Sequence, residues 1–440
     1  MPAFSLDPPQ SAWCAELRAL AAERLRPLAE KGEPGHVNRA LVAELGQLGL
    51  LERLFTSGAV DLCLMRESLA YACTEAETAL ALQGLGAHPV HAHGTPAQRD
   101  RWLPRVADGT AIAAFALSEP AAGSDAAALD LRADAGASEP AAEPEGGLPV
   151  SAASAMAAEP ASAAEPGEPA SAGEPASAAE PASAAEPASA AESALVAESD
   201  GGARWRLTGE KCWISNAPEA DFYTVFARTT PGAGARGVTA FLVPADRPGL
   251  TGTGLDMLSP HPIGALSFDA VPVTADDVLG EVDRGFRVAM GTLNLFRPSV
   301  GAFAVGMAQA ALDATLAHTA QRDAFGGKLK DLQSVAHQVA EMALRTEAAR
   351  LMVYAAATAY DEGAPDVPKR AAMAKLLATE TAQYVVDQAV QLHGARALRR
   401  GHLLEHLYRE VRAPRIYEGA SEVQRGIIAK ELYATREAAQ

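Results

Sequence analysis

Apolar residues near the start of this 440-residue chain recur every three or four positions, a spacing that predicts amphipathic helices. Leu17, Ala21 and Leu25 follow this spacing, and the helical pattern continues to about Gly109. The run from about 61 to 91 is apolar on much of its surface. Such a run predicts a single helix that is buried on most sides.

The pattern then changes to short apolar runs that are bounded by turn residues. Runs of this length and alternation predict strands, and their turn-bounded succession predicts an antiparallel β segment. The runs are 111–117, 204–208, 222–226 and 238–243.

Helical periodicity returns at about Gly285 and persists to the C-terminus. We expect Pro298 in the first turn of a helix, where proline is tolerated, with further helices at about 332–360, at about 368–392 and after Ser421. The chain is therefore predicted to have three domains, at 1–110 (helical), 111–284 (β) and 285–440 (helical).

A low-complexity insertion interrupts the β segment at about 136–201, between two predicted strands. Its hexapeptide contains proline, which prevents a continuous helix, and few large apolar residues offset the entropy of ordering. We therefore expect this segment to be disordered or loosely polyproline-like. The hexapeptide is Glu159–Ala164, repeated at Glu174, Glu180 and Glu186, with a variant that ends in glycine at Glu168.

The net charge of −18 argues against nucleic-acid binding. Between Ser138 and Ser199 there are 11 glutamates and no lysine or arginine, and removing these charges leaves −7 for the rest of the chain. No stretch of about 18 apolar residues lacks charges, so no transmembrane segment is expected. The N-terminus lacks the basic and apolar regions of a secretory signal, which favours a cytoplasmic protein, and we expect a bacterial one.

The four cysteines do not have the spacing of metal ligands or of a disulfide framework. No metal site is predicted, and the cysteines are expected to be reduced, buried or half-buried thiols. They are Cys14, Cys63, Cys73 and Cys212.

Several short motifs occur in a particular order along the chain. In this order they resemble the acyl-CoA dehydrogenase family, which removes two hydrogens from the α and β carbons of an acyl thioester. The resemblance covers nearly the whole chain outside the insertion. It implies a mainly α protein with an N-terminal helical domain, a middle antiparallel β domain and a C-terminal four-helix bundle. The motifs are Gly94–Gln98 before Trp102–Pro104, Leu117–Asp125, Gly209–Asn216, Arg322–Gly326 with Gln333, Gln391–Gly394 and Arg415–Glu422.

The resemblance makes Glu418 the candidate catalytic base. Removing the weakly acidic α proton of a thioester needs a positioned base, and burial would raise the proton affinity of this carboxylate. Gly419 would allow close backbone approach. Some family members carry the base on another helix, where this chain has Phe296, which cannot serve. Without the family context, Glu418 would be read as a surface residue in a turn. The resemblance also implies substrate contacts at Ser124, Arg297, Gly419 and Lys430.

Loss of the β hydrogen with its electrons needs a two-electron acceptor that side chains cannot supply. The resemblance supplies flavin adenine dinucleotide (FAD). It implies a flavin loop at Phe115, Leu117, Ser118, Gly123 and Ser124; ring contacts at Trp213, Ile214 and Ser215; further contacts at Ala420 and Glu422; and contacts across a subunit interface at Arg322, Phe325, Gln333, Gln391 and Gly394.

Two positions depart from the family pattern. Ala420 replaces the usual threonine, and Gly394-Ala395 stands where two glycines are common. Neither departure changes the type of reaction that the resemblance implies. Both are expected to affect the environment of the flavin and the local backbone geometry. His393 is expected to be a core or helix-end residue and neither an acid nor a base.

The sequence therefore predicts an FAD-dependent acyl-CoA dehydrogenase that forms a trans-2-enoyl-CoA. We expect it to pass electrons to an electron-transfer flavoprotein and to be a homodimer or homotetramer. One alternative is an oxidase or monooxygenase on the same scaffold, although Glu418 disfavours the monooxygenase. The other is a catalytically silent assembly or binding protein.

Overall fold

A β-sheet lies between two helical segments along the chain in the computed structural model, which describes residues 6–135 and 204–438. These residues belong to one compact unit. The helices before the sheet are α1 (Pro8–Leu20), α2 (Arg26–Ala29), α3 (Arg39–Gln47), α4 (Arg53–Thr56), α5 (Ala59–Ala72), α6 (Thr74–His93) and α7 (Pro96–Ala107).

The prediction of one helix over 61–91 was wrong, because α5 and α6 are separate. Cys73 between them has an extended backbone, with φ −155° and ψ 101°. Glu75 and Glu77 lie in the first turn of α6, where carboxylates interact favourably with the helix dipole. The break turns α6 away from α5 so that it can also contact strand β1 (Ala113–Ala116) of the sheet.

The motif at 94–98 has a structural role. Thr95 and Gln98 form a capping box at the start of α7, in which each side chain bonds the other residue's backbone. The Gln98 amide also donates to the backbone carbonyl of Val278, at 3.2 Å. This motif therefore ties α7 to the edge of the sheet.

The sheet has eight strands, paired in the order β6-β7-β3-β2-β4-β5-β8, with β1 paired to β4. Most pairs are antiparallel, as predicted, whereas β1–β4 and β2–β4 are parallel. Residues 135 and 205, which flank the predicted disordered insertion, are partners in the β2–β3 pair. The insertion itself lies outside the described residues. The remaining strands are β2 (Arg132–Ala135), β3 (Trp205–Ser215), β4 (Phe222–Arg228), β5 (Val238–Pro244), β6 (Leu250–Gly254), β7 (Ile263–Val273) and β8 (Val278–Leu279).

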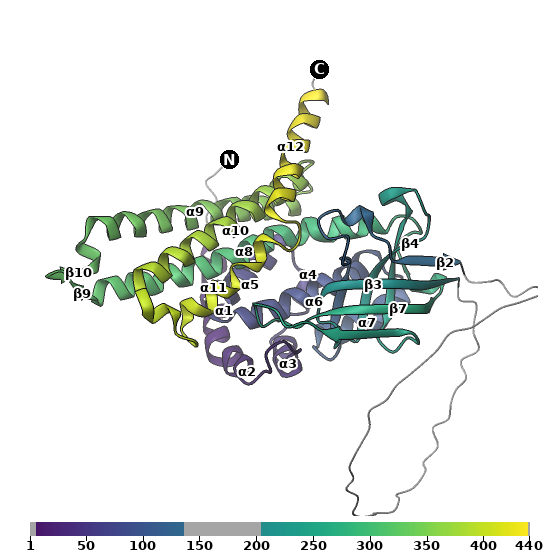
Figure 1. The fold of residues 1–440 in the computed structure, drawn as a ribbon, viewed down its shortest axis with the longest axis horizontal. Coiled ribbons are helices and arrows are strands. Elements are labelled where there is room, and N and C mark those ends of the chain that lie inside the picture. Colours follow the sequence, from purple (N-terminus) through teal and green to yellow (C-terminus); the bar gives the residue numbers. More distant parts are fainter. Residues whose placement is uncertain (1–5, 136–203, 439–440) are drawn as a thin grey trace, which may run out of the picture. The chain divides into compact units, whose positions relative to one another are not determined.

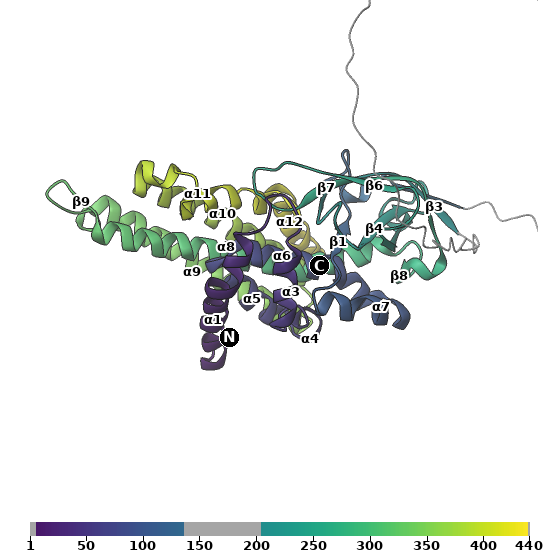
Figure 2. The same cartoon turned by 90° about the horizontal axis from the view of Figure 1, so that it is seen from below.

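Long helices dominate the C-terminal segment, and α8, α9 and α10 run side by side (Figures 1 and 2). The short hairpin β9–β10 joins α8 to α9 at one end of this bundle (Figure 1). The elements are α8 (Gly285–Gln321), β9 (Asp323–Ala324), β10 (Gly327–Lys328), α9 (Gln333–Asp361), α10 (Val367–His393), α11 (Leu403–Glu410) and α12 (Ser421–Ala438).

Pro298 lies inside α8, so its predicted place in a first turn was wrong. A proline inside a helix cannot donate to a carbonyl one turn earlier. The Ser299 hydroxyl donates to the carbonyl of Phe296 at 2.7 Å and so satisfies one acceptor near this site. Burial of α8 on nearly all sides then stabilises the helix through packing.

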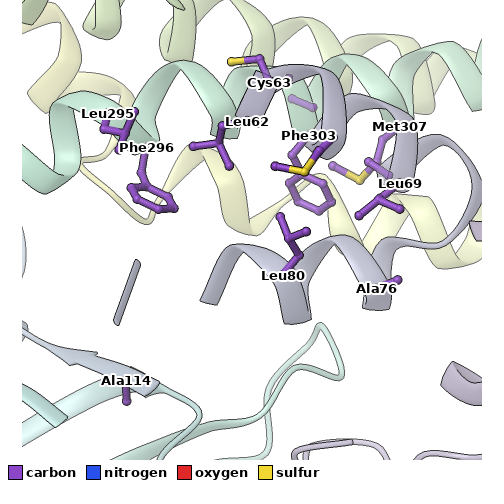
Figure 3. Packing of buried hydrophobic residues seen from close by; sticks show 14 of the residues in the cluster. Leu62, Cys63, Leu69, Ala76, Leu80, Ala114, Leu295, Phe296, Phe303 and Met307 are labelled. Atoms are coloured by element: carbon purple, nitrogen blue, oxygen red, sulfur yellow. The ribbon is translucent and has the colours of Figure 1, made fainter. Parts of the chain in front are cut away.

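Helix α5 packs against α8 in the centre of the helical core. Figure 3 shows Leu69 of α5, Leu80 of α6 and Phe303 and Met307 of α8 converging in this core. Within 6–135 and 204–438, α8 alone is apolar and long enough to cross a membrane, but 72% of that window is buried inside the molecule. This burial favours a core helix over a membrane span.

Two smaller predictions are confirmed. All four cysteines are free and are buried or half-buried. His393 is buried at the last position of α10, where its Nδ1 lies 2.8 Å from the carbonyl oxygen of Ala389.

Candidate active site

The candidate base lies in a tight left-handed turn before α12. Glu418 has φ 52° and Gly419 has φ 93°. The φ of Gly419 favours glycine, and a Cβ there would also displace the Gln424 amide, which would lie 2.5 Å away. Left-handed backbone is unfavourable for glutamate, and such conformations persist where surrounding contacts determine them.

Three side chains from three helices donate to the two carbonyls of this turn. Arg297 of α8 donates to the Glu418 carbonyl at 3.1 Å. Lys375 of α10 donates to the Gly419 carbonyl at 2.7 Å. Gln424 of α12 donates to both carbonyls, at 3.0 and 2.9 Å. We call these three donors the carbonyl clamp. They hold the backbone that carries the Glu418 carboxylate.

The Glu418 side chain has one buried oxygen and lies near three cationic side chains. The residue is half-buried, but its Oε2 atom is fully buried and has no hydrogen-bond partner among the described residues. Burial raises the pKa of Glu418 above 4.5, while the nearby cations Arg66, Arg297 and Lys375 oppose this rise. A carboxylate with raised proton affinity and an oxygen that no protein group binds is suited to accept a proton when it is ionised.

Arg66 approaches the candidate base from α5 and belongs to a buried ion pair. Its guanidinium binds the Glu77 carboxylate and donates to the Ser299 hydroxyl at 2.7 Å. The residue at the alternative family position, Phe296, is buried and packs against Gly84. Among residues 6–135 and 204–438, Glu418 is therefore the carboxylate that combines raised proton affinity with an unpartnered oxygen.

The predicted flavin loop is fixed to strand β3 by a buried lysine. The Lys211 ammonium donates to the carbonyl of Leu117 at 2.9 Å and to the Glu119 carboxylate at 2.8 Å. That carboxylate also accepts from the backbone of Asp130 and Leu131, at 2.6 and 2.9 Å. Burial lowers the pKa of Lys211 to about 8, although Glu119 opposes this change. The start of the loop is therefore rigidly positioned.

Next to this loop, β3 presents an aromatic ring to solvent. Trp213 is 49% exposed and has φ 57°, at an irregularity in the β3–β7 pairing. The amide of Cys212 donates to the Ser118 carbonyl at 3.0 Å, so the tryptophan and the loop are neighbours. Leu117 and Ile214 are buried beneath this surface, whereas Gly123 and Ser124 are exposed. The structure therefore joins the flavin loop and the predicted ring contacts into one surface.

A flat aromatic flavin fits this surface. An exposed indole offers a stacking face, and the adjacent loop offers small residues and backbone groups without bulk. Phe115 stands half-buried behind the loop, with its ring 4.9 Å from that of Phe226.

Five other predicted flavin contacts lie near the C-terminal end of α8. Arg322, at the end of α8, is 25 residues beyond Arg297, or about 37 Å of helix at 1.5 Å per residue. The stacked rings of His318 and His393, 4.2 Å apart, bring this end of α8 beside the end of α10. Gly394 there has φ 65°, a backbone that favours glycine. The members of this distal group are all exposed: Arg322, Phe325, Gln333, Gln391 and Gly394.

The remaining predicted residues do not converge on one point. Arg297 is buried under the catalytic turn, and its contact with a substrate stays a prediction. Glu422 and Lys430 are exposed on α12, and Glu422 pairs with Arg425 at 3.5 Å. Ala420 is half-buried between the turn and α12.

The sequence analysis missed four residues that shape these sites. Lys375 lies among alanines at 371, 372, 374 and 378, and a lysine on an apolar helix face is a signal of a buried, partnered cation. The others are Arg66, which binds Glu77; Gln424, which binds the catalytic turn; and Glu119, whose partner Lys211 is distant in sequence.

A third buried ion pair fixes the segment that leads into the catalytic turn. Glu410, the last residue of α11, accepts from the Ser259 hydroxyl at 2.7 Å and lies 2.6 Å from His261 Nε2. Burial alone would raise the pKa of Glu410, but His261 lowers it to about 2. Burial alone would lower the pKa of His261, but Glu410 raises it.

This pair predicts a pH-dependent stability. Because the pKa of Glu410 is lowered on folding, its contribution to stability is fully present above about pH 4.5 and is lost as the pH falls towards about 2. Because the pKa of His261 is raised on folding, its contribution to stability is present at low pH and is lost as the pH rises through the pKa of folded His261. We expect His261→Gln to lower the free energy of unfolding by about 2 kcal/mol at about pH 5.5 and by clearly less at about pH 8.5. Urea unfolding at both pH values measures this. An equal loss at both values would contradict it.

The chain is similar in sequence to proteins of one known family. Three family models match: the acyl-CoA dehydrogenase N-terminal domain at residues 7–110, the middle domain at 176–271 and the C-terminal domain at 283–433. The chain is 32% identical over 429 residues to the mitochondrial short-chain specific acyl-CoA dehydrogenase of Bos taurus, covering 94% of this chain and 88% of that protein.

Two further proteins are similar over nearly the full length. A protein of Mycobacterium tuberculosis, named as a probable acyl-CoA dehydrogenase, is 30% identical over 440 residues, covering 98% of this chain and 96% of the relative. The structure of butyryl-CoA dehydrogenase from Megasphaera elsdenii superposes with a TM-score of 0.77 at 27% identity, covering 98% of this chain and 99% of that one.

Proposed function

The chain belongs to the acyl-CoA dehydrogenase family of FAD-dependent oxidoreductases, and from this premise we propose that it oxidises an acyl-CoA thioester to the trans-2-enoyl-CoA with Glu418 as the base. The observation that carries the proposal is the buried, unpartnered Oε2 of Glu418 among three cations. The electrons pass to an electron-transfer flavoprotein.

Glu418 accepts the α proton of the thioester. Its raised pKa makes it a better base than an exposed carboxylate, while the cations keep it ionised so that it can act. The carbonyl clamp fixes the backbone of the turn, which limits how far the carboxylate can move. Gly419, Ser124, Arg297 and Lys430 are the proposed substrate contacts.

The chemistry that FAD supplies when bound is acceptance of the β hydride with its two electrons. Trp213, Ile214 and Ser215 would hold the ring system, together with the flavin loop at 115–124. The distal group around Arg322 would hold the phosphates, because arginine suits phosphate geometry.

The position of the distal group supports an oligomer. Arg297, which donates to the catalytic turn, and Arg322 of the distal group are about 37 Å apart along α8, so the distal group lies far from the catalytic turn of its own copy. We propose that two copies complete each flavin site, as a homodimer or within a homotetramer. In that arrangement the distal group of one copy faces the flavin loop of another.

An anaerobic titration tests the proposed function. We expect the flavin-loaded protein to be bleached by at least one thioester from a panel of straight-chain, branched and cyclic acyl-CoA compounds that begins with butyryl-CoA. Mass spectrometry of the product should show the loss of two hydrogens. A folded, flavin-loaded protein that no thioester bleaches would refute a dehydrogenase. Rapid reoxidation of the bleached protein by oxygen would favour the oxidase.

Removal of the distal arginine should weaken flavin retention. We expect Arg322→Ala to lose about 1.5–3 kcal/mol of flavin binding, the value of a charge-assisted hydrogen bond, and to shift the protein towards smaller assemblies. Flavin content after dialysis and size by light scattering measure both effects. Arg287→Ala, an exposed arginine at the other end of α8, is the control. Full flavin content in Arg322→Ala would contradict this placement.

A further inference from the structure

Lys375 is a fully buried lysine that the proposed chemistry does not itself require. It lies in the middle of α10, with 0% of its surface exposed. Lysine is rarely buried in this way without a partner. Its ammonium donates to the Gly419 carbonyl at 2.7 Å, directly behind the candidate base.

The three members of the carbonyl clamp are not equivalent. Gln424 lies six residues after Glu418 and belongs to the segment that it holds. Arg297 and Lys375 lie on α8 and α10, and so attach the turn to the helical bundle. Arg297 is also a proposed substrate contact, which makes its variants ambiguous. Lys375 is the anchor whose effect can be separated from substrate binding.

Charged groups act on Lys375 from the catalytic turn and from three helices. Glu418 approaches from the catalytic turn, Arg297 from α8, Glu380 from α10 and Glu422 from α12. Two of the three carboxylates have other partners. Glu380 accepts from the Ser421 hydroxyl at 2.6 Å and pairs with Arg415 at 2.9 Å, and Glu422 pairs with Arg425 at 3.5 Å.

Glu418 has no such hydrogen-bonded partner at its Oε2 atom. Facing this carboxylate are Arg66 from α5, Arg297 from α8 and Lys375 from α10. Arg66 is already paired with Glu77. Loss of the Lys375 ammonium would remove one of the three cations beside Glu418 and leave Arg66 and Arg297, so the proton affinity of Glu418 would rise.

We propose that Lys375 is a positioning residue for the base, one that anchors the strained Glu418–Gly419 turn and holds the Glu418 carboxylate in its ionised form. The inference rests on the proposed function, in which Glu418 accepts the α proton. Two physical effects act together: the hydrogen bond fixes where the carboxylate points, and the charge sets how readily it is ionised. Burial lowers the pKa of Lys375 to about 8, so the ammonium is present at neutral pH and below.

The test compares Lys375→Met with Lys369→Met. Lys369 lies on the same helix and pairs at its surface with Asp366 at 3.1 Å, so it controls for loss of a lysine from α10. The measurement is the exchange of α hydrogens of butyryl-CoA, or of a better thioester from the panel, with deuterated water across the pH range. Exchange needs only the base, so it reports on Glu418 separately from hydride transfer.

We expect Lys375→Met to slow exchange on the order of 10- to 100-fold and to move the acidic midpoint of its pH profile upwards by roughly one pH unit. Lys369→Met should match the unmodified protein in both. An unmoved midpoint, with or without slower exchange, would mean that the Lys375 charge does not set the ionisation of Glu418, and would overturn the inference. Lys375→Arg should keep the original midpoint, since it restores the charge.

Two further variants keep the outcome decisive. If Lys375→Met does not fold, Lys375→Gln removes the charge but keeps a donor, and the same upward movement of the midpoint is expected; an unmoved midpoint overturns the proposal. Glu418→Gln separates this inference from the proposed function. If Glu418→Gln still exchanges the α hydrogens, the proposed function is contradicted. If exchange is lost in Glu418→Gln but is unaffected in Lys375→Met, only the role of Lys375 is contradicted.

Discussion

Glu418→Gln is expected to keep its flavin and to lose turnover by at least about 1,000-fold, because the amide is nearly isosteric but cannot accept the α proton. The carbonyl clamp binds the backbone of this residue, so it should remain intact in the variant. The measurement is the anaerobic rate of flavin reduction by the best thioester, with flavin content from the absorbance spectrum.

The pH dependence of the unmodified protein gives a matching expectation. Reduction should slow as the pH falls through the pKa of Glu418, which burial raises above 4.5, since only the ionised carboxylate can act. Glu362→Gln, at the exposed end of α9, is the matched control and should retain full activity. Reduction of Glu418→Gln at a near-normal rate would remove Glu418 from the mechanism.

The second large effect is expected at the ion pair beneath the flavin loop. Glu119→Gln should lower the free energy of unfolding by about 3 kcal/mol, because it leaves the buried Lys211 ammonium without its counter-charge. The loop from Leu117 to Ser124 should then lose its fixed position, and flavin should dissociate during dialysis. Urea unfolding and flavin absorbance measure the two losses.

The destabilisation should also depend on pH with a definite sign. Burial already lowers the pKa of Lys211 to about 8, and loss of Glu119 should lower it further. The folded variant then binds fewer protons than its unfolded chain, so its stability rises with pH. The difference in the free energy of unfolding between Glu119→Gln and the unmodified protein should therefore become smaller from about pH 6 to about pH 8.

Lys211→Met provides the matched comparison. Glu119 would keep its two backbone donors, from Asp130 and Leu131, so the carboxylate would still be partly satisfied. We expect a smaller loss of stability than in Glu119→Gln. If both variants lose the same free energy of unfolding, or if the loss in Glu119→Gln does not depend on pH, Glu119 does not act by neutralising the charge of Lys211.

Local sequence patterns were sufficient to predict the bounds of an element where that element buries one apolar face. The helical periodicity predicted α9 and α10 nearly to their ends, and the turn-bounded runs predicted β4 and β5. They were insufficient at the α5–α6 break and at Pro298. Both α5 and α8 are buried on most sides, so their patterns have no clear period. In addition, packing can hold a proline inside a helix.

The same division applies to the sites. The ordered motifs identified the family, and with it FAD and the candidate base, because the residues around Glu418 and Trp213 are contiguous in sequence. The partners that tune those residues are not contiguous. Lys375 is 44 residues from Gly419, and Lys211 is 92 residues from Glu119, so neither contact has a local sequence signal.

By itself, the sequence determined the order of helical, β and helical segments and the residues that the family resemblance marks for chemistry. Only the tertiary structure decided how those residues are held and charged. It placed three cations beside one carboxylate, and it placed Arg322 about 37 Å along α8 from Arg297, which donates to the catalytic turn. The physical reason is that proton affinity depends on burial and on charges within a few ångströms, and α5, α8 and α10 bring such charges together from distant parts of the chain.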